Sequence, residues 1–323
     1  MSLVICMRRF LSFNDFFKEY YGGKTVKLSL DGGFSCPNRD GTLSEIGCIF
    51  CSDDGSGEFA GSKYLSLDEQ IESQKEFLKN KWKAENYIAY FQNFTNTYGS
   101  LESLRKIYDK IADRDDIKGI SIATRCDCLD DEKIEYLKKI SKKKTLWLEL
   151  GMQTVSEDTI KVINRGYSHK IFDETVKKLQ DANILFLIHA IFGLPFEDEK
   201  DFENTITYIR DLAPFGVKFH NLYILKDSPI YELYKSKNFK ILSRDEYVDL
   251  VLKALDTIDE KTVVHRITGD PPKAKIFEPT WCADKLSVIS EIDKKLKENN
   301  KKVVSQDDIK KIVGYWKNID RAF

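Results

Sequence analysis

Three cysteines occupy one short loop near the start of the chain, in the run C-P-N-R-D-G-T-L-S-E-I-G-C-I-F-C. Cys36, Cys48 and Cys51 bring three soft thiolate ligands together, and the two-residue spacer lets Cys48 and Cys51 hold one metal centre. Three thiolates fit a four-iron, four-sulfur cluster that keeps one iron open. An open iron can bind a cofactor or a substrate and take part in its chemistry.

A structural zinc site uses the same thiolates and is the alternative occupant of the loop. Such a site needs a fourth ligand, and the loop itself offers none. The remaining candidates are the other cysteines and the histidines: Cys6, Cys126, Cys128, Cys282, His169, His189, His220 and His265. Cys126 and Cys128 alternate along the chain, so they are either two ordinary buried thiols or part of a second metal site.

The bulk composition excludes several classes of protein. With 42% apolar and 32% charged residues over 323 positions, the chain is an ordinary globular protein. Its net charge of −1 argues against broad nonspecific binding of nucleic acid. No apolar run reaches the roughly 18 residues of a membrane span, and the apolar run at 3–7 is too short for a signal peptide. We therefore expect a cytoplasmic protein without disulfides.

The elements that position the cysteine loop alternate between strands and helices. Apolar runs predict strands at 25–30, 87–94, 119–123, 146–150, 184–192 and 217–225. Apolar residues with helical spacing fill the intervals, and together they predict parallel βαβ units. The cysteine loop follows the first strand, so we expect it at the carboxyl ends of the strands, where barrel enzymes keep their active sites.

The pattern changes after residue 230. Helical stripes at 247–258, 286–296 and 309–316 flank a short strand candidate at 262–267. The sequence therefore predicts three segments: an N-terminal lead-in at 1–16, a partial barrel at 17–230, and an α-rich C-terminal extension at 231–323 packed on the barrel.

These features together resemble the radical S-adenosylmethionine superfamily over residues 17–285. The commonest motif of that superfamily is C-x3-C-x2-C, whereas this chain has C-x11-C-x2-C. The longer spacing is similar to the branch that contains the catalytic subunit of Elongator, and the runs C-P-N-R-D-G-T and G-C-I-F-C are similar to the YhcC-like group. The resemblance implies an α/β fold, a partial six-stranded (β/α) barrel, with a 4Fe-4S cluster on Cys36, Cys48 and Cys51 and S-adenosylmethionine as cofactor.

The resemblance also implies cofactor contacts at the strand ends. Asn93 and Thr95 follow the second strand, where the superfamily holds the methionine amine. The usual Gly-Gly-Glu motif is absent there, and a hydrogen-bonded turn is the alternative. Arg125, with Asp127, is expected to face the pocket after the third strand. Gln153, in E-L-G-M-Q-T, matches the E-x-G-x-Q-S/T strand end and is expected at the ribose.

Three more positions follow from the same resemblance. Arg165, in I-N-R-G, resembles an arginine that pairs with the methionine carboxylate, a task that suits its planar fork. The alternative is a surface arginine at a helix end. His189 lies where relatives place a polar group at the ribose, and its alternative is a satisfied core histidine. Gly193 begins the G-L-P turn that lies near the adenine in the superfamily.

The activity implied is reductive cleavage of S-adenosylmethionine to a 5'-deoxyadenosyl radical that removes hydrogen from a substrate. An external donor of the flavodoxin or ferredoxin type would supply the electron. His220, Tyr223 and Lys226 are candidates for the substrate side. The substrate stays open: the likeness to Elongator and the lysine runs at 138–144 and 294–302 make tRNA one candidate, and a small molecule or a protein is the alternative. The lysine runs are otherwise solvated helix faces and ends. A zinc-binding interaction module without catalysis is the alternative function.

Overall fold

One curled, all-parallel sheet forms the centre of the computed structural model, which describes residues 9–53, 55, 60–79, 82–237 and 239–320. Its strand order is β1-β2-β3-β4-β5-β6-β8, and a small antiparallel sheet pairs β7 with β9. The strands are β1 (Thr25–Leu30), β2 (Asn86–Phe91), β3 (Ile117–Thr124), β4 (Thr145–Gln153), β5 (Leu185–Phe192), β6 (Gly216–Asn221), β7 (Ile224–Leu225), β8 (Val263–Arg266) and β9 (Ile276–Glu278).

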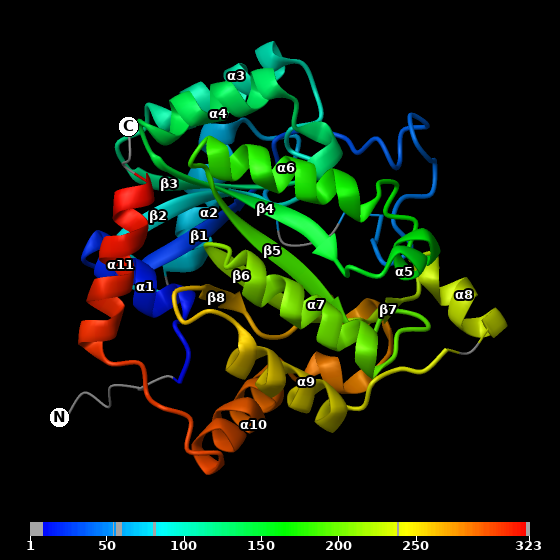
Figure 1. Ribbon diagram of the computed structural model, residues 1–323. Helices are drawn as coiled ribbons and strands as arrows, with labels where there is room; N and C mark the ends of the chain where they lie inside the picture. Colours follow the sequence, from blue (N-terminus) through cyan, green and yellow to red (C-terminus); the bar gives the residue numbers. More distant parts are fainter. Residues whose placement is uncertain (1–8, 54, 56–59, 80–81, 238, 321–323) are drawn as a thin grey trace.

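Helices cover the outer face of this half-barrel (Figure 1). The α-helices are α1 (Phe13–Tyr21), α2 (Leu67–Lys79), α3 (Leu101–Ala112), α4 (Asp131–Ser141), α5 (Glu157–Val162), α6 (His169–Asp181), α7 (Glu199–Leu212), α8 (Ile230–Lys237), α9 (Arg244–Thr257), α10 (Lys285–Glu298) and α11 (Gln306–Asp320). Several begin at side-chain caps. Asp130 caps α4, and Ser243 forms a capping box with Glu246 at the start of α9.

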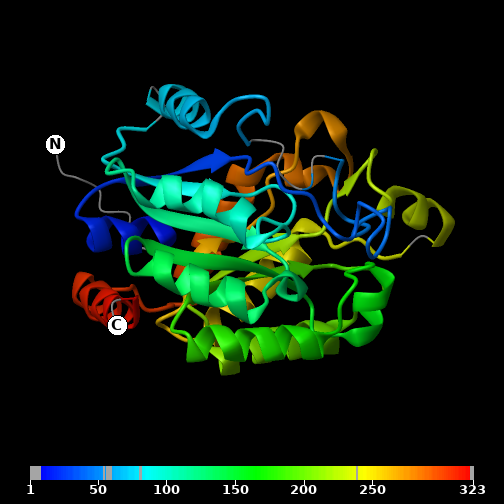
Figure 2. The same cartoon turned by 90° about the horizontal axis from the view of Figure 1, so that it is seen from above.

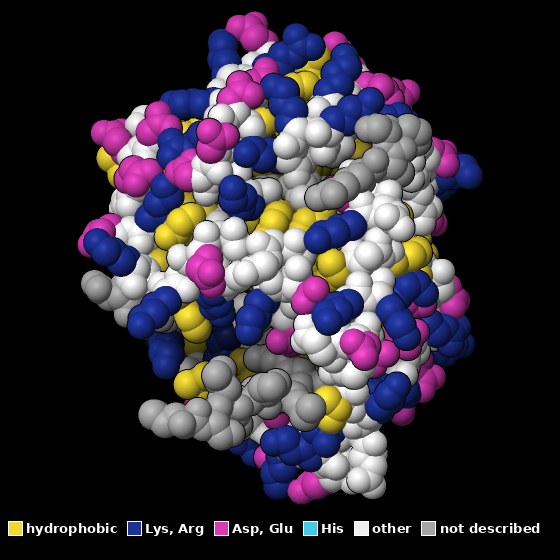
Figure 3. Space-filling model, turned by 90° about the vertical axis from the view of Figure 1, so that its left-hand side faces the viewer, with side chains coloured by type: hydrophobic (Ala, Val, Ile, Leu, Met, Phe, Trp, Pro, Cys, Tyr) yellow, Lys and Arg dark blue, Asp and Glu magenta, His cyan; other side chains and the backbone are white. Residues whose placement is uncertain are grey.

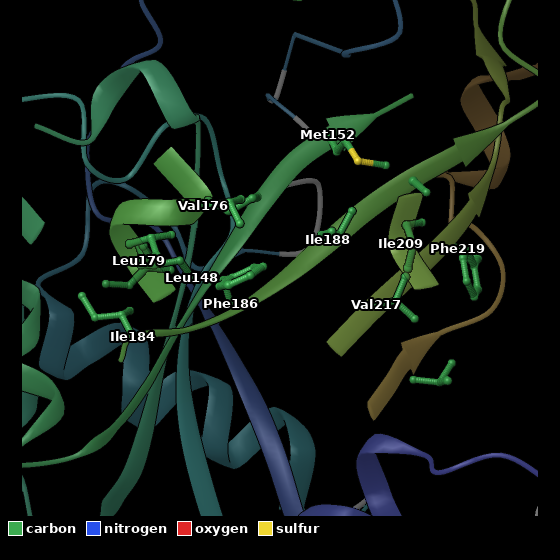
Figure 4. Close-up of a cluster of buried hydrophobic side chains, with 14 of the residues drawn as sticks. Leu148, Met152, Val176, Leu179, Ile184, Phe186, Ile188, Ile209, Val217 and Phe219 are labelled. Atoms are coloured by element: carbon green, nitrogen blue, oxygen red, sulfur yellow. The ribbon is translucent and has the colours of Figure 1, made fainter. Parts of the chain in front are cut away.

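Side chains alternate between the two faces of each strand, and this alternation builds both the core and the cavity. On β4, Leu148, Leu150 and Met152 point outward into the core, while Glu149 and Gln153 point into the half-barrel. Figure 4 shows the outward set, in which Leu148 of β4 lies beside side chains of β5 and α6. The inward positions are therefore free to carry polar groups without disturbing the core.

The sheet has one strand more than the sequence predicts. β8 pairs in parallel with β6, although its residues fall in the segment assigned to the C-terminal extension. The predicted strand at 217–225 also ends earlier, because β7 leaves the main sheet to pair with β9. The correction arises because sheet membership depends on partners far along the chain. Barrel and extension therefore share one sheet, with β1 and β8 as its end strands, and the N–H of Val264 on β8 donates to the carbonyl of Leu11 at 2.8 Å.

The first and last helices lie side by side at the amino ends of the strands (Figure 1). Tyr20 of α1 donates a hydrogen bond to Asp320 of α11 at 2.5 Å. Both helices pack on residues near the strand starts, including Trp147 and Phe215. Acidic and basic side chains are interspersed on this face (Figure 3). In the described part of the chain, no helix has the length and apolarity needed to cross a bilayer.

Candidate active site

A cavity of about 700 Å³ occupies the half-barrel and reaches the carboxyl ends of its strands. Cys36, Cys48 and Cys51 all line it, and each is half-buried. The predicted position of the cysteine loop at this end of the sheet is therefore correct. The cavity has the size expected of a small-molecule or cofactor site.

Backbone contacts fix the cysteine loop to distant parts of the chain. The N–H of Ile49 donates to the carbonyl of Ile163 at 3.0 Å, and the carbonyl of Ile49 accepts from the N–H of Ile230 at 2.9 Å. The Ile49 side chain lies in a separate apolar cluster with Ile163 and Ile230. Figure 2 shows the blue loop beside the yellow-green segment that contains α8. These contacts hold the cysteine loop against the residue that follows α5 and against the start of α8.

Asn38 stabilises the cysteine loop through its buried side chain. It was not identified from the sequence as a site residue. Its side chain is fully buried, and its Nδ2 donates to the carbonyl of Asn164 at 2.6 Å and lies 3.5 Å from the Sγ of Cys48. Gly166 makes this approach possible. It has φ +83°, and a Cβ there would lie 2.9 Å from the Oδ1 of Asn38.

The cysteines of the loop differ electrostatically from the other described cysteines. A hydrogen bond from Cys51 lowers the pKa of Cys48 to about 7, and the charges of Arg125 and Arg165 act in the same direction against burial. Burial raises the pKa of the Cys128 thiol to about 12. The surroundings of Cys48 therefore favour its thiolate, which is the ligand form of cysteine.

The donor set fits an iron–sulfur cluster better than a zinc ion. Among the residues that the structure describes, no group of three or more His, Cys, Asp or Glu side chains could hold a single ion. Cys126, Cys128 and Cys282 are buried elsewhere, and Cys6 lies outside the described residues. A cluster needs only the three thiolates that already line the cavity.

Arg165 is buried, so the surface alternative for it is wrong. Only 1% of it is exposed. Its Nη1 donates to the carbonyl of Met152 at 2.6 Å and its Nε donates to the carbonyl of Tyr167 at 3.1 Å. Its Nη2 is buried and has no partner in the described part of the chain. An orphaned guanidinium donor in the wall of a cavity fits a carboxylate ligand.

Arg125 and Gln153 also line the cavity. Arg125 forms a two-bond pair with Asp127, at 2.9 and 2.7 Å, and its Nη1 donates to the carbonyl of Arg165 at 2.8 Å. Gln153 has φ +61° at an irregularity in the pairing of β4 with β5. Its amide nitrogen donates to the carbonyls of Gly151 at 2.7 Å and Met152 at 3.1 Å.

The other predicted contacts divide into two groups. Thr95 and His189 line the cavity, as do His220 and Tyr223. Asn93, Gly193 and Lys226 are not among the described residues that line it. The amide of Asn93 donates to Asp31 at 3.2 Å, as the hydrogen-bonded turn alternative predicts. Gly193, with φ +87°, packs against Leu242.

A charged group lies deeper in the half-barrel, and His189 is its one member that was predicted from the sequence as a site residue. Glu149 accepts from Lys27 at 2.6 Å, from Ser121 at 2.7 Å and from His189 at 2.9 Å, and it also pairs with Lys218. It stands four residues before Gln153 on β4, roughly 13 Å deeper along the strand. The cavity therefore has a cysteine-rich outer layer and a charged inner layer.

Burial and pairing set the charge states of this inner layer. Burial alone would raise the pKa of Glu149, but the charges of Lys218 and Lys27 and the hydrogen bond from His189 hold that pKa well below its usual range. Burial and the charge of Lys218 lower the pKa of His189 to about 4. His189 is therefore neutral at pH 7 and donates its Nε2 hydrogen to an ionised Glu149.

A signal for this layer does exist in the sequence. Lys27 lies inside the strand T-V-K-L-S-L and Lys218 inside G-V-K-F-H-N, both at positions that alternate with buried apolar residues. A lysine in the middle of a covered strand is unusual unless it is paired. Such positions mark the inward face of the sheet.

Comparison with known proteins agrees with this geometry. The model of the Radical SAM superfamily matches residues 36–209, and that of the Radical_SAM C-terminal domain matches residues 214–298. The chain therefore belongs to the radical SAM superfamily of enzymes.

Relatives extend over most of the chain. It is 43% identical to YtqA of Bacillus subtilis over 90% of each chain, and 30% identical to YhcC of Escherichia coli K12 over 86% of this chain and 89% of that protein. The solved structure of Elp3 from Methanocaldococcus infernus superposes with a TM-score of 0.65 at 15% identity. That superposition covers 86% of this chain and 64% of the Elp3 chain, and it supports the partial-barrel fold.

Proposed function

We propose that this protein cleaves S-adenosylmethionine reductively at a 4Fe-4S cluster held by Cys36, Cys48 and Cys51. The observation that carries the proposal is the convergence of the three cysteines and the orphaned Arg165 donor on one cavity wall. When bound, such a cluster supplies the electron that converts the cofactor to methionine and a 5'-deoxyadenosyl radical, which takes hydrogen from a substrate. A flavodoxin or ferredoxin would deliver that electron.

The chain's own residues bind and orient the cofactor in this proposal. Arg165 offers Nη2 to the methionine carboxylate, and Arg125 adds positive charge nearby. Thr95, after β2, and Gln153, at the end of β4, present polar groups to the same cavity. Asn38 and the packed loop hold the cysteines in place, and the enclosing strands limit access of water.

An anaerobic cofactor assay tests the proposal. The reconstituted protein should be brown, bind about four irons per chain, and release 5'-deoxyadenosine when dithionite is added with S-adenosylmethionine. Cys36→Ala, Cys48→Ala and Cys51→Ala should each abolish the product, whereas Cys282→Ala should not. A colourless zinc protein, or a cluster-loaded protein without product, would contradict the proposal and favour the interaction module.

We further propose RNA, in the form of tRNA, as the substrate. The lysine runs noted in the sequence support this weakly, since Lys143, Lys295 and Lys301 pair with aspartates. Stronger support comes from Phe77 and Trp82, which line the cavity and are 71% and 44% exposed. Exposed aromatic rings at a cavity mouth suit stacking by unpaired bases.

Binding to tRNA should therefore depend on these rings and on salt. Phe77→Ala and Trp82→Ala should each weaken tRNA binding about tenfold at low salt, measured by fluorescence anisotropy with labelled tRNA. Tyr315→Ala is the matched control, because this ring is 45% exposed on α11 at the opposite end. Absence of tRNA binding to the cluster-loaded protein at low salt would favour a small-molecule or protein substrate.

A further inference from the structure

The cavity lining carries more positive than negative charge. Six cationic side chains line the described cavity, namely Lys27, Arg39, Arg125, Arg165, Lys218 and Arg266, against two carboxylates, Glu149 and Asp270. Asp270 is already paired with Lys285 at 2.7 Å. Glu149 is thus the one carboxylate available to the inner cations within the part of the chain that the structure describes.

Most of these cations have structural partners. Arg39 donates to the carbonyls of Ser52 and Asp53 at 2.6 and 3.2 Å, and Arg125 is held by Asp127. Lys27 and Lys218 share Glu149. Arg266 differs, since it makes no hydrogen bond or ion pair with any residue in the described ranges. A guanidinium without such partners among the described residues, beside two lysines that share one carboxylate, leaves this end of the cavity with uncompensated positive charge.

The sheet register holds Arg266 next to the other inner groups. His189 on β5 is the register partner of Lys218 on β6, and Lys218 is the register partner of Arg266 on β8. The three residues therefore form one row across adjacent strands, and all three line the cavity. His220, two residues beyond Lys218, adds a buried Nε2 without a partner in the described residues. Arg266 and His220 therefore both present hydrogen-bonding groups that have no partner among the described residues.

We infer that Arg266, with Lys218 and Lys27, forms an oxyanion-binding subsite for the substrate, which would carry a carboxylate or a phosphate group. The inference rests on the proposed function, because it names the substrate class of that same cavity. A planar guanidinium matches either anion with two parallel hydrogen bonds. The two lysines add positive charge. Their ion pairs with Glu149 keep both ammonium groups on the inner wall of the cavity, which limits how far they can move when a ligand binds.

The alternative role for Arg266 is support of the sheet edge, and the charge count argues against it. An arginine that only stabilises an edge strand would pair with a carboxylate or a backbone carbonyl, as Arg125 and Arg165 do. Uncompensated charges that face one another across a cavity raise the free energy of the folded state. Such an arrangement persists where a ligand of opposite charge relieves it.

Titration calorimetry with simple anions tests the subsite in the cluster-loaded protein. Inorganic phosphate and malonate are titrated separately, with sodium chloride holding the ionic strength constant. At least one of them should bind, and Arg266→Gln should weaken that binding about tenfold or more. Arg244→Gln is the matched control, since this arginine lies on α9, half-exposed beside Asp245, and it should leave binding unchanged. Tighter binding of phosphate indicates a phosphorylated substrate, and tighter binding of malonate indicates a carboxylate.

A second variant and a second readout keep the outcome unambiguous. Arg266→Lys preserves the positive charge but loses the planar guanidinium, so this variant should bind the anion with intermediate affinity. Its thermal unfolding midpoint reports whether the fold is intact. Failure of both anions to bind, or equal affinity in Arg266→Gln and Arg244→Gln, would overturn the inference. Release of 5'-deoxyadenosine without substrate is measured on the same samples. Its loss in the wild-type protein would overturn the proposed function instead, whatever the anions do.

Discussion

At the scale of single residues, Arg165 joins the strand end of β4 to the loop that follows α5. Its guanidinium donates to the backbone carbonyls of Met152, Thr154 and Tyr167, and its own carbonyl accepts from Arg125. The sequence placed it in the site through a resemblance, but the structure gives it a second task as a backbone support. A change at this position should therefore affect both stability and the cofactor.

Arg165→Lys should lower the free energy of unfolding by about 2 kcal/mol, because an ammonium cannot bond to the carbonyls at the end of β4 and to that of Tyr167 at the same time, and so loses buried hydrogen bonds. Urea unfolding of the metal-free protein measures this change. Arg210→Lys on α7 is the control, since Arg210 is half-exposed and pairs with its neighbour Asp211 on the surface. Equal losses in the two variants would show that the buried contacts of Arg165 contribute nothing.

At the scale of elements, the cysteine loop depends on Ile49 as its apolar anchor. Two isoleucines of the same loop differ strongly in exposure: Ile49 is 8% exposed and Ile46 is 58% exposed. The backbone bonds of Ile49 survive truncation of its side chain, so the effect of packing can be measured alone.

Ile49→Ala should cost about 2–4 kcal/mol through the cavity it leaves in its cluster, and it should lower the iron content after reconstitution. Ile46→Ala should change the free energy of unfolding by less than about 0.5 kcal/mol. Iron analysis and urea unfolding of both variants provide the comparison. Full iron content in Ile49→Ala would mean that the thiolates alone organise the loop.

Local patterns explain which elements were predictable. The first strand was predicted at 25–30 and is observed at Thr25–Leu30, because its apolar run and glycine turn are both local signals. The membership of β8 in the sheet depends on pairing with β6, which no local pattern records. The same holds within the site. The cysteines share one motif, whereas Asn38 contacts Asn164 and Lys27 contacts Glu149 across more than a hundred residues.

At the scale of the whole molecule, buried histidines make stability depend on pH. Burial lowers the pKa of His265 well below its usual range, and both of its ring nitrogens lack partners in the described part of the chain. It lies among the rings of Phe13, Phe17 and Phe215. The unfolded chain binds a proton at this residue below about pH 6.5, whereas the folded chain does not. The free energy of unfolding therefore decreases as the pH falls below that value.

His265→Phe should raise the free energy of unfolding by about 1 kcal/mol at pH 7, because it replaces two unsatisfied polar atoms with carbon. The advantage over the wild type should grow by about 1 kcal/mol for each pH unit between pH 6 and 5. Urea unfolding across this range measures both quantities. Parallel profiles for the two proteins would mean that His265 is protonated in the folded state.

The position of α1 and α11 determines how the protein can be immobilised on a solid support. Both helices lie at the amino ends of the strands, and the cysteine loop lies at the carboxyl ends. A linker attached to an exposed side chain of either helix therefore starts on the face opposite the cavity. The protein can be immobilised on a bead or an electrode through such a linker with its cysteine loop turned toward the solution, so that bulky reaction partners still have access to it.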